Sequence, residues 1–221
     1  MNMEQEKSQI LLKGRKNKML EGISVALKSH YDTANGAKNI LESAVAQIKA
    51  NYIGAMLAEK MKEAQEIYNN TLAESRKANF DACIEILDDV ANQARKVVEV
   101  SVPADFISTL EAIKNSENRT QREIEAVLGA YKNNYWAYRS VSTILGGSLK
   151  GFGVITIDEI LDHIDDLKAE LHKCFYQYNV TEGYQYRNVL EGTIISDYDV
   201  VFRAFIEGRF EDAVQNEEGK E

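Results

Sequence analysis

The stretch from residue 156 to residue 178 constrains the fold more than any other part of the chain. Its uncharged positions recur at alternating spacings of three and four residues, which places them along one edge of an α-helix. A helix with such an edge packs against another helix or against a second copy of itself. We therefore predict a packing seam and take its seven positions as candidate interaction residues. They are Ile157, Ile160, Ile164, Leu167, Leu171, Cys174 and Tyr178.

Composition favours an all-α fold. The chain has 221 residues, a single proline and thirteen glycines, and residues that favour helices are abundant. Proline breaks a helix interior but fits its first turn, so Pro103 is expected to open a helix. No segment shows the sustained alternation of apolar and polar residues that is typical of strands. We predict an all-α, elongated helical bundle with long helices and coiled-coil-like seams, more than about two thirds helical.

Helices are expected along most of the chain from apolar periodicity and capping signals. Residues 31–36 resemble a turn, and the apolar stripe of the long helix after it changes phase near residue 57. Residues 180–195 show no clear pattern, and a kink is expected near Asn79. The expected helices cover residues 4–30, 37–76, 79–99, 103–114, 120–145, 156–178 and 197–214. Capping boxes are expected at Thr120 with Glu123, at Thr156 with Glu159 and at Ser196 with Asp199.

A glycine-rich segment divides the chain. Residues 146–153 read GGSLKGFG and are the clearest interruption of the helical pattern. Glycine lowers helix stability, so such a cluster favours a flexible connection. We predict a hinge at 146–153 between an N-terminal helical region, 1–145, and a C-terminal helical region, 154–215, with a disordered tail at 216–221.

The formal net charge of −9 is concentrated in the second half of the chain. Residues 1–100 carry 14 basic and 14 acidic side chains, whereas residues 101–221 carry 12 basic and 21 acidic ones. An acidic surface of this kind repels nucleic acid and anionic lipid. No run of residues is apolar and long enough for a signal peptide or a membrane span, so a soluble, cytoplasmic protein is expected.

The chain contains two cysteines, Cys83 and Cys174. Each falls on the apolar face of an expected helix, beside Ile84 and Phe175 respectively. A catalytic thiolate would need a polar, electropositive pocket instead. Buried free thiols in a reducing compartment are therefore the preferred interpretation.

No motif for catalysis, a metal or a cofactor is found in the sequence. The glycines of 146–153 lack the order of a phosphate-binding loop, with Lys150 before its glycine and no strand pattern upstream. Glu159, His163 and Asp166 lie on neighbouring helical turns, but the chain has no Glu-x-x-His pair of the kind used by helical di-metal bundles. We expect no enzyme activity, no cofactor and no metal.

Nucleic-acid binding has two limited supports. Residues 132–139, KNNYWAYR, interleave cations with aromatic rings as stacking platforms do, although a core stripe of tyrosines at heptad spacing explains them better. The same tyrosine face is the best candidate wall for a small-molecule pocket. The other support is a basic arm that could contact phosphates weakly and without sequence preference. The basic arm is Lys13, Arg15, Lys16 and Lys18, and the tyrosine face is Tyr131, Tyr135 and Tyr138.

These features favour a non-enzymatic protein that acts through helix-to-helix contact. An assembly, scaffold or adaptor protein fits the acidic, proline-poor, helical profile, which scaffold proteins for shell assembly share, including those of tailed phages. We expect protein partners and a homo-oligomer held by the 157–178 seam, unless helices of the same chain fill that seam. The alternative is a small nucleic-acid-binding or regulatory protein that uses the basic arm.

Overall fold

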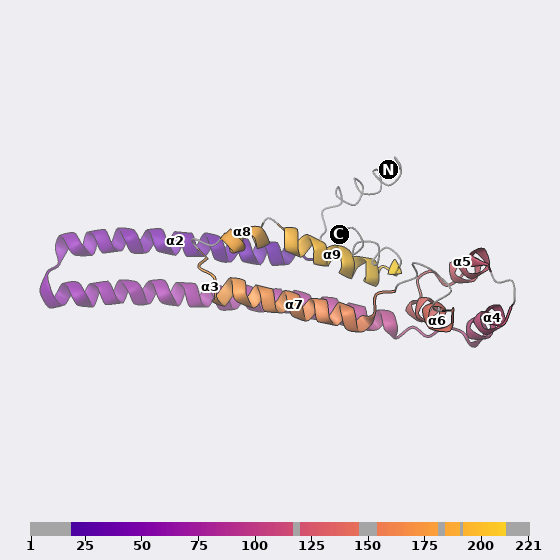
Figure 1. Ribbon diagram of the computed structural model, residues 1–221. Coiled ribbons are helices and arrows are strands. Elements are labelled where there is room, and N and C mark those ends of the chain that lie inside the picture. Colours follow the sequence, from indigo (N-terminus) through magenta and orange to yellow (C-terminus); the bar gives the residue numbers. More distant parts are fainter. Residues whose placement is uncertain (1–18, 117–119, 146–153, 181–183, 191, 211–221) are drawn as a thin grey trace, which may run out of the picture. The chain divides into compact units, whose positions relative to one another are not determined.

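The chain is all-α over the residues that the computed structural model describes, which are 19–116, 120–145, 154–180, 184–190 and 192–210. Within these ranges 84% of the residues are helical, in eight helices and no strand, which confirms the predicted fold class. The predicted hinge, tail and basic arm lie outside the described residues. The helices (Figure 1) are α2 (Glu21–Asn51), α3 (Gly54–Val98), α4 (Ala104–Lys114), α5 (Gln121–Gly129), α6 (Tyr135–Leu145), α7 (Ile157–Tyr176), α8 (Tyr184–Leu190) and α9 (Thr193–Ile206).

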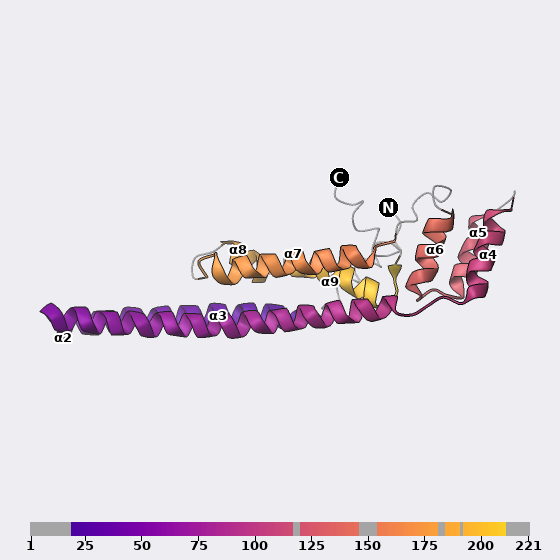
Figure 2. The same cartoon turned by 90° about the horizontal axis from the view of Figure 1, so that it is seen from below.

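The two longest helices, α2 and α3, form an antiparallel hairpin, in which Figures 1 and 2 show them side by side. Only residues 52 and 53 separate the helices. Gly54 opens α3 with a φ of 58°, a left-handed conformation that suits glycine and strains residues with a side chain. The apex of the hairpin therefore needs glycine at this position.

The register of the hairpin follows from two close approaches between its helices. His30 Nδ1 of α2 lies 2.9 Å from Ser75 Oγ of α3. Nearer the start of α2, a Cβ atom on Gly22 would come within 2.6 Å of Ile86 Cδ1. Opposed residues therefore have numbers that sum to between 105 and 108, as an antiparallel pair with its apex at 52 and 53 requires.

The predicted turn at residues 31–36 is wrong, because these residues continue α2. Asp32, Asn35 and Gly36 favour turns, but Ala34 between them is completely buried, and packing overrides weak local propensity. The predicted helix over residues 37–76 is also wrong, because it runs through the apex of the hairpin at residues 52 and 53. The change of apolar phase near residue 57 was the signal of that apex.

Predicted helix starts are confirmed at three places. Pro103 occupies the N-cap position of α4. Thr120 and Glu123 form the expected capping box, with the Glu123 amide donating to Thr120 Oγ1 at 3.3 Å. Before α7, the Glu159 amide donates to Thr156 Oγ1 at 3.1 Å, and Glu159 accepts the Thr156 amide in return. Each box satisfies amides that the first helical turn leaves unpaired.

Other boundaries differ from the predictions. The expected helix over 120–145 is two helices, α5 and α6. The side chain of Asn134 accepts the Ala137 amide at 3.1 Å and so caps the start of α6. α3 is one continuous helix through Asn79, so the residues between the expected helices 37–76 and 79–99 are helical too. α9 begins at Thr193, so the proposed cap at Ser196 lies inside a helix.

The chain divides into two compact units, each made of two chain segments. Unit 1 comprises Met1–Ile86 and Lys168–Ser196, and unit 2 comprises Leu87–Leu167 and Asp197–Glu221. The division predicted from the sequence, with two consecutive regions on either side of residues 146–153, stays a prediction. The boundaries between the two units fall inside the helices α3, α7 and α9. A boundary inside a helix has no glycine-rich or polar segment that the sequence could show.

Unit 2 packs its aromatic residues around α6. Tyr135 is buried, and its ring centre lies 5.6 Å from that of Phe205 in α9 and 5.7 Å from that of Phe210. The Tyr135 hydroxyl accepts the Ile157 amide at the start of α7 at 3.3 Å. Trp136 is 42% exposed and donates its indole N–H to the Val98 carbonyl at 2.7 Å.

Candidate interaction surface

The seam of α7 is buried within the folded chain. Ile157 and Tyr178, at its two ends, are partly exposed. The five positions between them are at most 1% exposed, so helices of the same chain already fill the centre of the seam. They are Ile160, Ile164, Leu167, Leu171 and Cys174.

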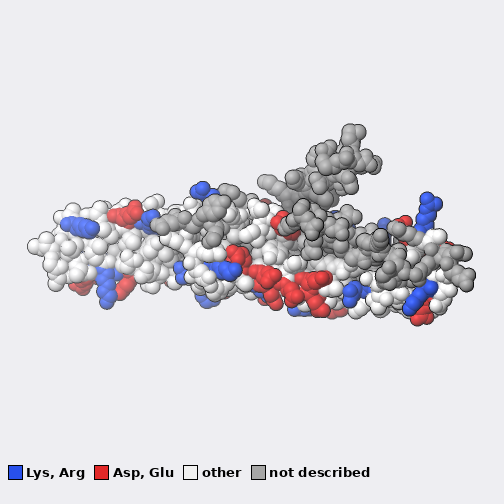
Figure 3. Space-filling view, in the orientation of Figure 1, with Lys and Arg blue, Asp and Glu red and all other residues white. Residues whose placement is uncertain are grey.

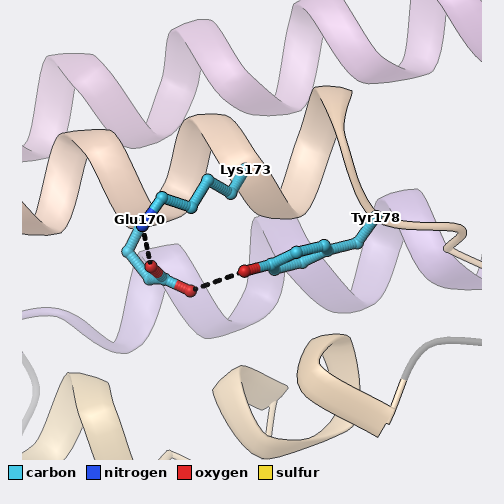
Figure 4. Close-up of polar contacts among 3 residues, drawn as sticks. All are labelled: Glu170, Lys173 and Tyr178. Atoms are coloured by element: carbon cyan, nitrogen blue, oxygen red, sulfur yellow. Dashed lines mark hydrogen bonds and ion pairs between the residues drawn. The ribbon is translucent and has the colours of Figure 1, made fainter.

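Tyr178 takes part in a surface contact at the end of the seam (Figure 4). Its hydroxyl donates to Glu170 Oε1 at 3.4 Å, and Lys173 Nζ donates to Glu170 Oε2 at 3.0 Å. The hydrogen bond and the negative charge of Glu170 raise the pKa of Lys173. An exposed network of this kind adds little stability and is no candidate for chemistry.

The outer side of α7 carries acidic side chains, which gather over this helix in Figure 3. All five of those in its first half are exposed, as expected for the side opposite a buried seam. Among the described residues, no group of three or more His, Cys, Asp or Glu side chains could hold a metal ion. The five acidic residues are Asp158, Glu159, Asp162, Asp165 and Asp166.

The aromatic face proposed for stacking bases or lining a pocket serves the core instead. Tyr135 and Tyr138 are 2% and 7% exposed, and Tyr131 packs edge-on against Phe106 of α4 with ring centres 4.8 Å apart. The burial of Tyr135 and Tyr138 agrees with the interpretation of this segment as a core stripe of tyrosines at heptad spacing.

The least covered part of the described chain is the apex half of the α2–α3 hairpin, residues 38–68, which we name the arm. No residue from 38 to 82 is buried, whereas α2 before this point buries Ile23, Leu27 and Ala34. Large apolar side chains are exposed on the arm, among them Ile53 at 88% and Ile40 at 69%. The others are Ile67 at 65%, Met56 at 50% and Tyr52 at 38%.

The apex of the arm carries no charge over residues 50–58, and Figure 3 shows this end of the hairpin as an uncharged surface. Sequence reasoning missed the arm because it placed the turn elsewhere. The available signal was the uncharged stretch with Gly54 at its centre, at the change of apolar phase.

The base of the hairpin differs because α8 and the end of α7 cover it. The Tyr186 hydroxyl of α8 donates to the Leu27 carbonyl of α2 at 2.7 Å. Phe175 of α7 lies with its ring centre 5.8 Å from that of Phe80 in α3. Figures 1 and 2 show these elements on one side of the hairpin, away from its apex. Four helices therefore pack at the base and two in the arm.

His30 is the polar residue at the centre of this base. It is 1% exposed, and its ring centre lies 5.3 Å from that of Phe175. Burial, and then the nearby charge of Arg76, lower its pKa from 6.5 to about 4. His30 is therefore neutral near pH 7, and its role is to pack and to share a hydrogen bond with Ser75.

Cys83 and Cys174 are both buried free thiols, as predicted. Burial raises the pKa of each thiol to about 12, and their mutual proximity adds to the shift at Cys83. A thiol with so high a pKa is a poor nucleophile at pH 7. Both are thus structural residues of unit 1.

We expect both thiols of the native chain to react with an aromatic disulfide reagent at least about a hundredfold more slowly than in denaturant, because reaction needs local unfolding. Absorbance of the released thiolate measures both rates, and two thiols per chain should react in denaturant. Fast reaction of either thiol in the native chain would contradict its burial.

Comparison with protein families, with curated protein sequences and with solved structures finds no match to this chain. No described helix has the length and apolarity needed to cross a membrane. The arm is therefore identified as the candidate site from its own exposed apolar residues.

Proposed function

We propose that the chain is a non-enzymatic assembly, scaffold or adaptor protein that acts through helix-to-helix contact, with the arm as its contact element. The observation that carries the proposal is the exposure of Ile53, Ile40 and Ile67 on a hairpin with no buried residue in its apex half. Apolar surface of this kind gains free energy when a partner covers it. The seam of α7, which the sequence favoured for this role, is already filled.

The arm is suited to protein contact for two further reasons. A two-helix hairpin cannot shield both of its broad faces, so each face offers a groove for helices of another molecule. The acidic net charge of −9 disfavours nucleic acid as the general partner.

A shortened arm tests the proposal. Removing residues 39–45 and 61–67 deletes one heptad from each helix, Ile40 and Ile67 included, and preserves the apolar phase, the apex and all residues of the base. Full-length and shortened chains are recovered from native cells by affinity purification, and light scattering sizes the recovered species. We expect the full-length chain in a larger species and the shortened chain as a monomer of unchanged thermal stability within a few degrees.

Equal sizes for the two chains would contradict the proposal. Circular dichroism of the shortened chain is the control for folding, since the base should retain its helices.

A further inference from the structure

The exposed isoleucine of α2 lies on the side of the hairpin that faces away from α8. Tyr31 of α2 stacks on Tyr186 of α8 with ring centres 6.0 Å apart, so it marks the side that α8 covers. Ile40 follows Tyr31 by nine residues, which is about two and a half helical turns. Its side chain is therefore on the opposite side of the helix, where it is 69% exposed.

The same relation holds on α3. Arg76 lies over the Tyr176 ring of α7, with its Cζ atom 5.4 Å from the ring centre. Ile67 precedes Arg76 by nine residues, so it lies on the side of α3 that faces away from α7. Figure 2 shows α7 and α8 along the same side of the hairpin. We name the opposite side the back face.

All large apolar side chains that are exposed within α2 and α3 lie on the back face. Besides the two isoleucines, they are Val25 at 62% and Met56 at 50%. Val25 lies fifteen residues before Ile40, and Met56 lies eleven residues before Ile67. These separations are close to four and three whole turns, so each pair shares one side of its helix. Exposed apolar side chains gathered on one face indicate a contact with another molecule.

The back face of α2 has room for another helix. Its surface is hollowed by a groove beside Ile40, lined by Asn39, Ser43, Ala44 and Gln47. The positions of this face between Val25 and the apex are small or uncharged, so no charge would be buried by a helix that packs on them. They are Ser29, Thr33, Gly36, Ile40, Ser43 and Gln47.

We propose that a second copy of this chain covers the back face, with the two hairpins packed antiparallel about a twofold axis so that α2 meets α2 and α3 meets α3. The proposal rests on the proposed function and names its partner. The register of the hairpin places Ile40 level with residues 65 to 68 of α3, a span that includes Ile67. One axis that passes beside both isoleucines therefore brings Ile40 and Ile67 of the two copies into a single apolar cluster.

Charge complementarity identifies a second copy as the partner. Lys60 and Glu74 lie seven residues before and after Ile67, so both share its side of α3. An axis at Ile67 sets Lys60 of each copy opposite Glu74 of the other, which forms two opposite-charge pairs. On α2, the same axis sets Thr33 opposite Gln47, and no charged residues of the back face of α2 meet. The back face is therefore complementary to itself.

The remaining exposed apolar residues are covered by the same axis. It sets Met56, near the apex of one copy, opposite Ala78 at the base of the other, and Val25 opposite Ala55. α7 and α8 lie on the other side of each hairpin and leave the back face accessible (Figure 2). All of these contacts are made by residues of unit 1.

The size and polarity of the back face set the expected affinity. From residue 25 to residue 51, α2 extends about 39 Å, and two helices side by side are about 20 Å wide, so each copy buries roughly 800 Å². Specific protein interfaces bury about 800 Å² per partner. Much of this face consists of polar side chains, which contribute less than apolar ones. We therefore expect a reversible dimer with a Kd of the order of 10 µM.

The test is sedimentation equilibrium of the purified full-length chain and its variants at about 1 to 500 µM, a range that spans the expected Kd. Lys60→Glu and Glu74→Lys should each raise the Kd about tenfold, because each replaces two opposite-charge pairs with like-charge pairs. The combined variant carrying both changes should return to within about threefold of the wild type.

Substitutions that add one negative charge identify the face. Ile40→Asp and Ile67→Asp should each abolish association up to about 500 µM, because the axis brings two carboxylates together in the interface. Asn69→Asp is the matched control, since Asn69 is exposed and lies two turns before Arg76, on the side of α7. It should leave the Kd within about twofold. All three positions are exposed in the monomer, and circular dichroism checks that the variants remain helical.

Any of four results would overturn the inference: a wild type that stays monomeric at about 500 µM, association of either isoleucine variant, loss of association in Asn69→Asp, or no recovery in the combined variant. A monomeric purified chain that still depends on its arm for a larger species in cells would refute the self-pairing and leave the proposed function standing. Equal sizes of the full-length and shortened chains in cells would refute both.

Discussion

A chain that carries Ile164→Asp should unfold at 25 °C, with loss of most of its helical circular dichroism. Ile164 is 1% exposed at the centre of the α7 seam, so the aspartate must be ionised without a partner or protonated in an apolar site. The expected cost is about 4 kcal/mol or more, which approaches the whole stability of a typical domain. Urea titration followed by circular dichroism measures it.

The matched control for this substitution is Asp162→Asn on the exposed side of the same helix. It should change the free energy of unfolding by less than about 0.5 kcal/mol. A folded Ile164→Asp chain that only dissociates into smaller species would show that the seam serves association after all.

Lowering the pH should destabilise the chain through His30. The folded-state pKa of about 4 lies below the ordinary value of 6.5, so the unfolded chain binds the additional proton between these values. The stabilising contribution is therefore complete above pH 6.5 and declines as the pH falls to about 4. The loss amounts to about 3 kcal/mol.

The surroundings of His30 explain the size of this effect. Ser75 and Arg76 of α3, Phe175 of α7 and Tyr186 of α8 face the imidazole. The only charge among these four is positive, so an imidazolium would be both buried and repelled.

The His30→Gln variant provides the comparison, because glutamine retains a hydrogen-bonding group and binds no proton in this range. Urea unfolding of both chains from pH 7.5 to 4 should show the stability advantage of the wild type shrinking by about 3 kcal/mol. Carboxylates titrate in both chains, so their contribution cancels in the difference. A difference that stays constant with pH would contradict the low pKa of His30.

Much of the fold could be predicted from local sequence. The capping boxes at Thr120 and Thr156 depend on residues three apart, and the burial of Ile164 follows from its place in a heptad repeat. Such features are decided within a few helical turns, so the sequence pattern contains them.

The hairpin was harder to predict because its apex depends on competition between distant contacts. Residues 31–36 contain better turn formers than residues 52 and 53, yet Ala34 is buried and holds its segment in the helix. The arm could be located only after the apex was known. The sequence analysis therefore did not include the arm, and the centre of the seam that it favoured is buried.

The discontinuous unit 1 has a consequence for synthesis. Tyr186, which donates a hydrogen bond to the Leu27 carbonyl, follows it by 159 residues. At about 5 to 20 residues per second, a ribosome needs roughly 10 to 30 seconds to add that length. During this time the nascent α2–α3 hairpin has neither α8 nor the end of α7 to cover its base, so its apolar side is open to chaperones or to neighbouring nascent chains.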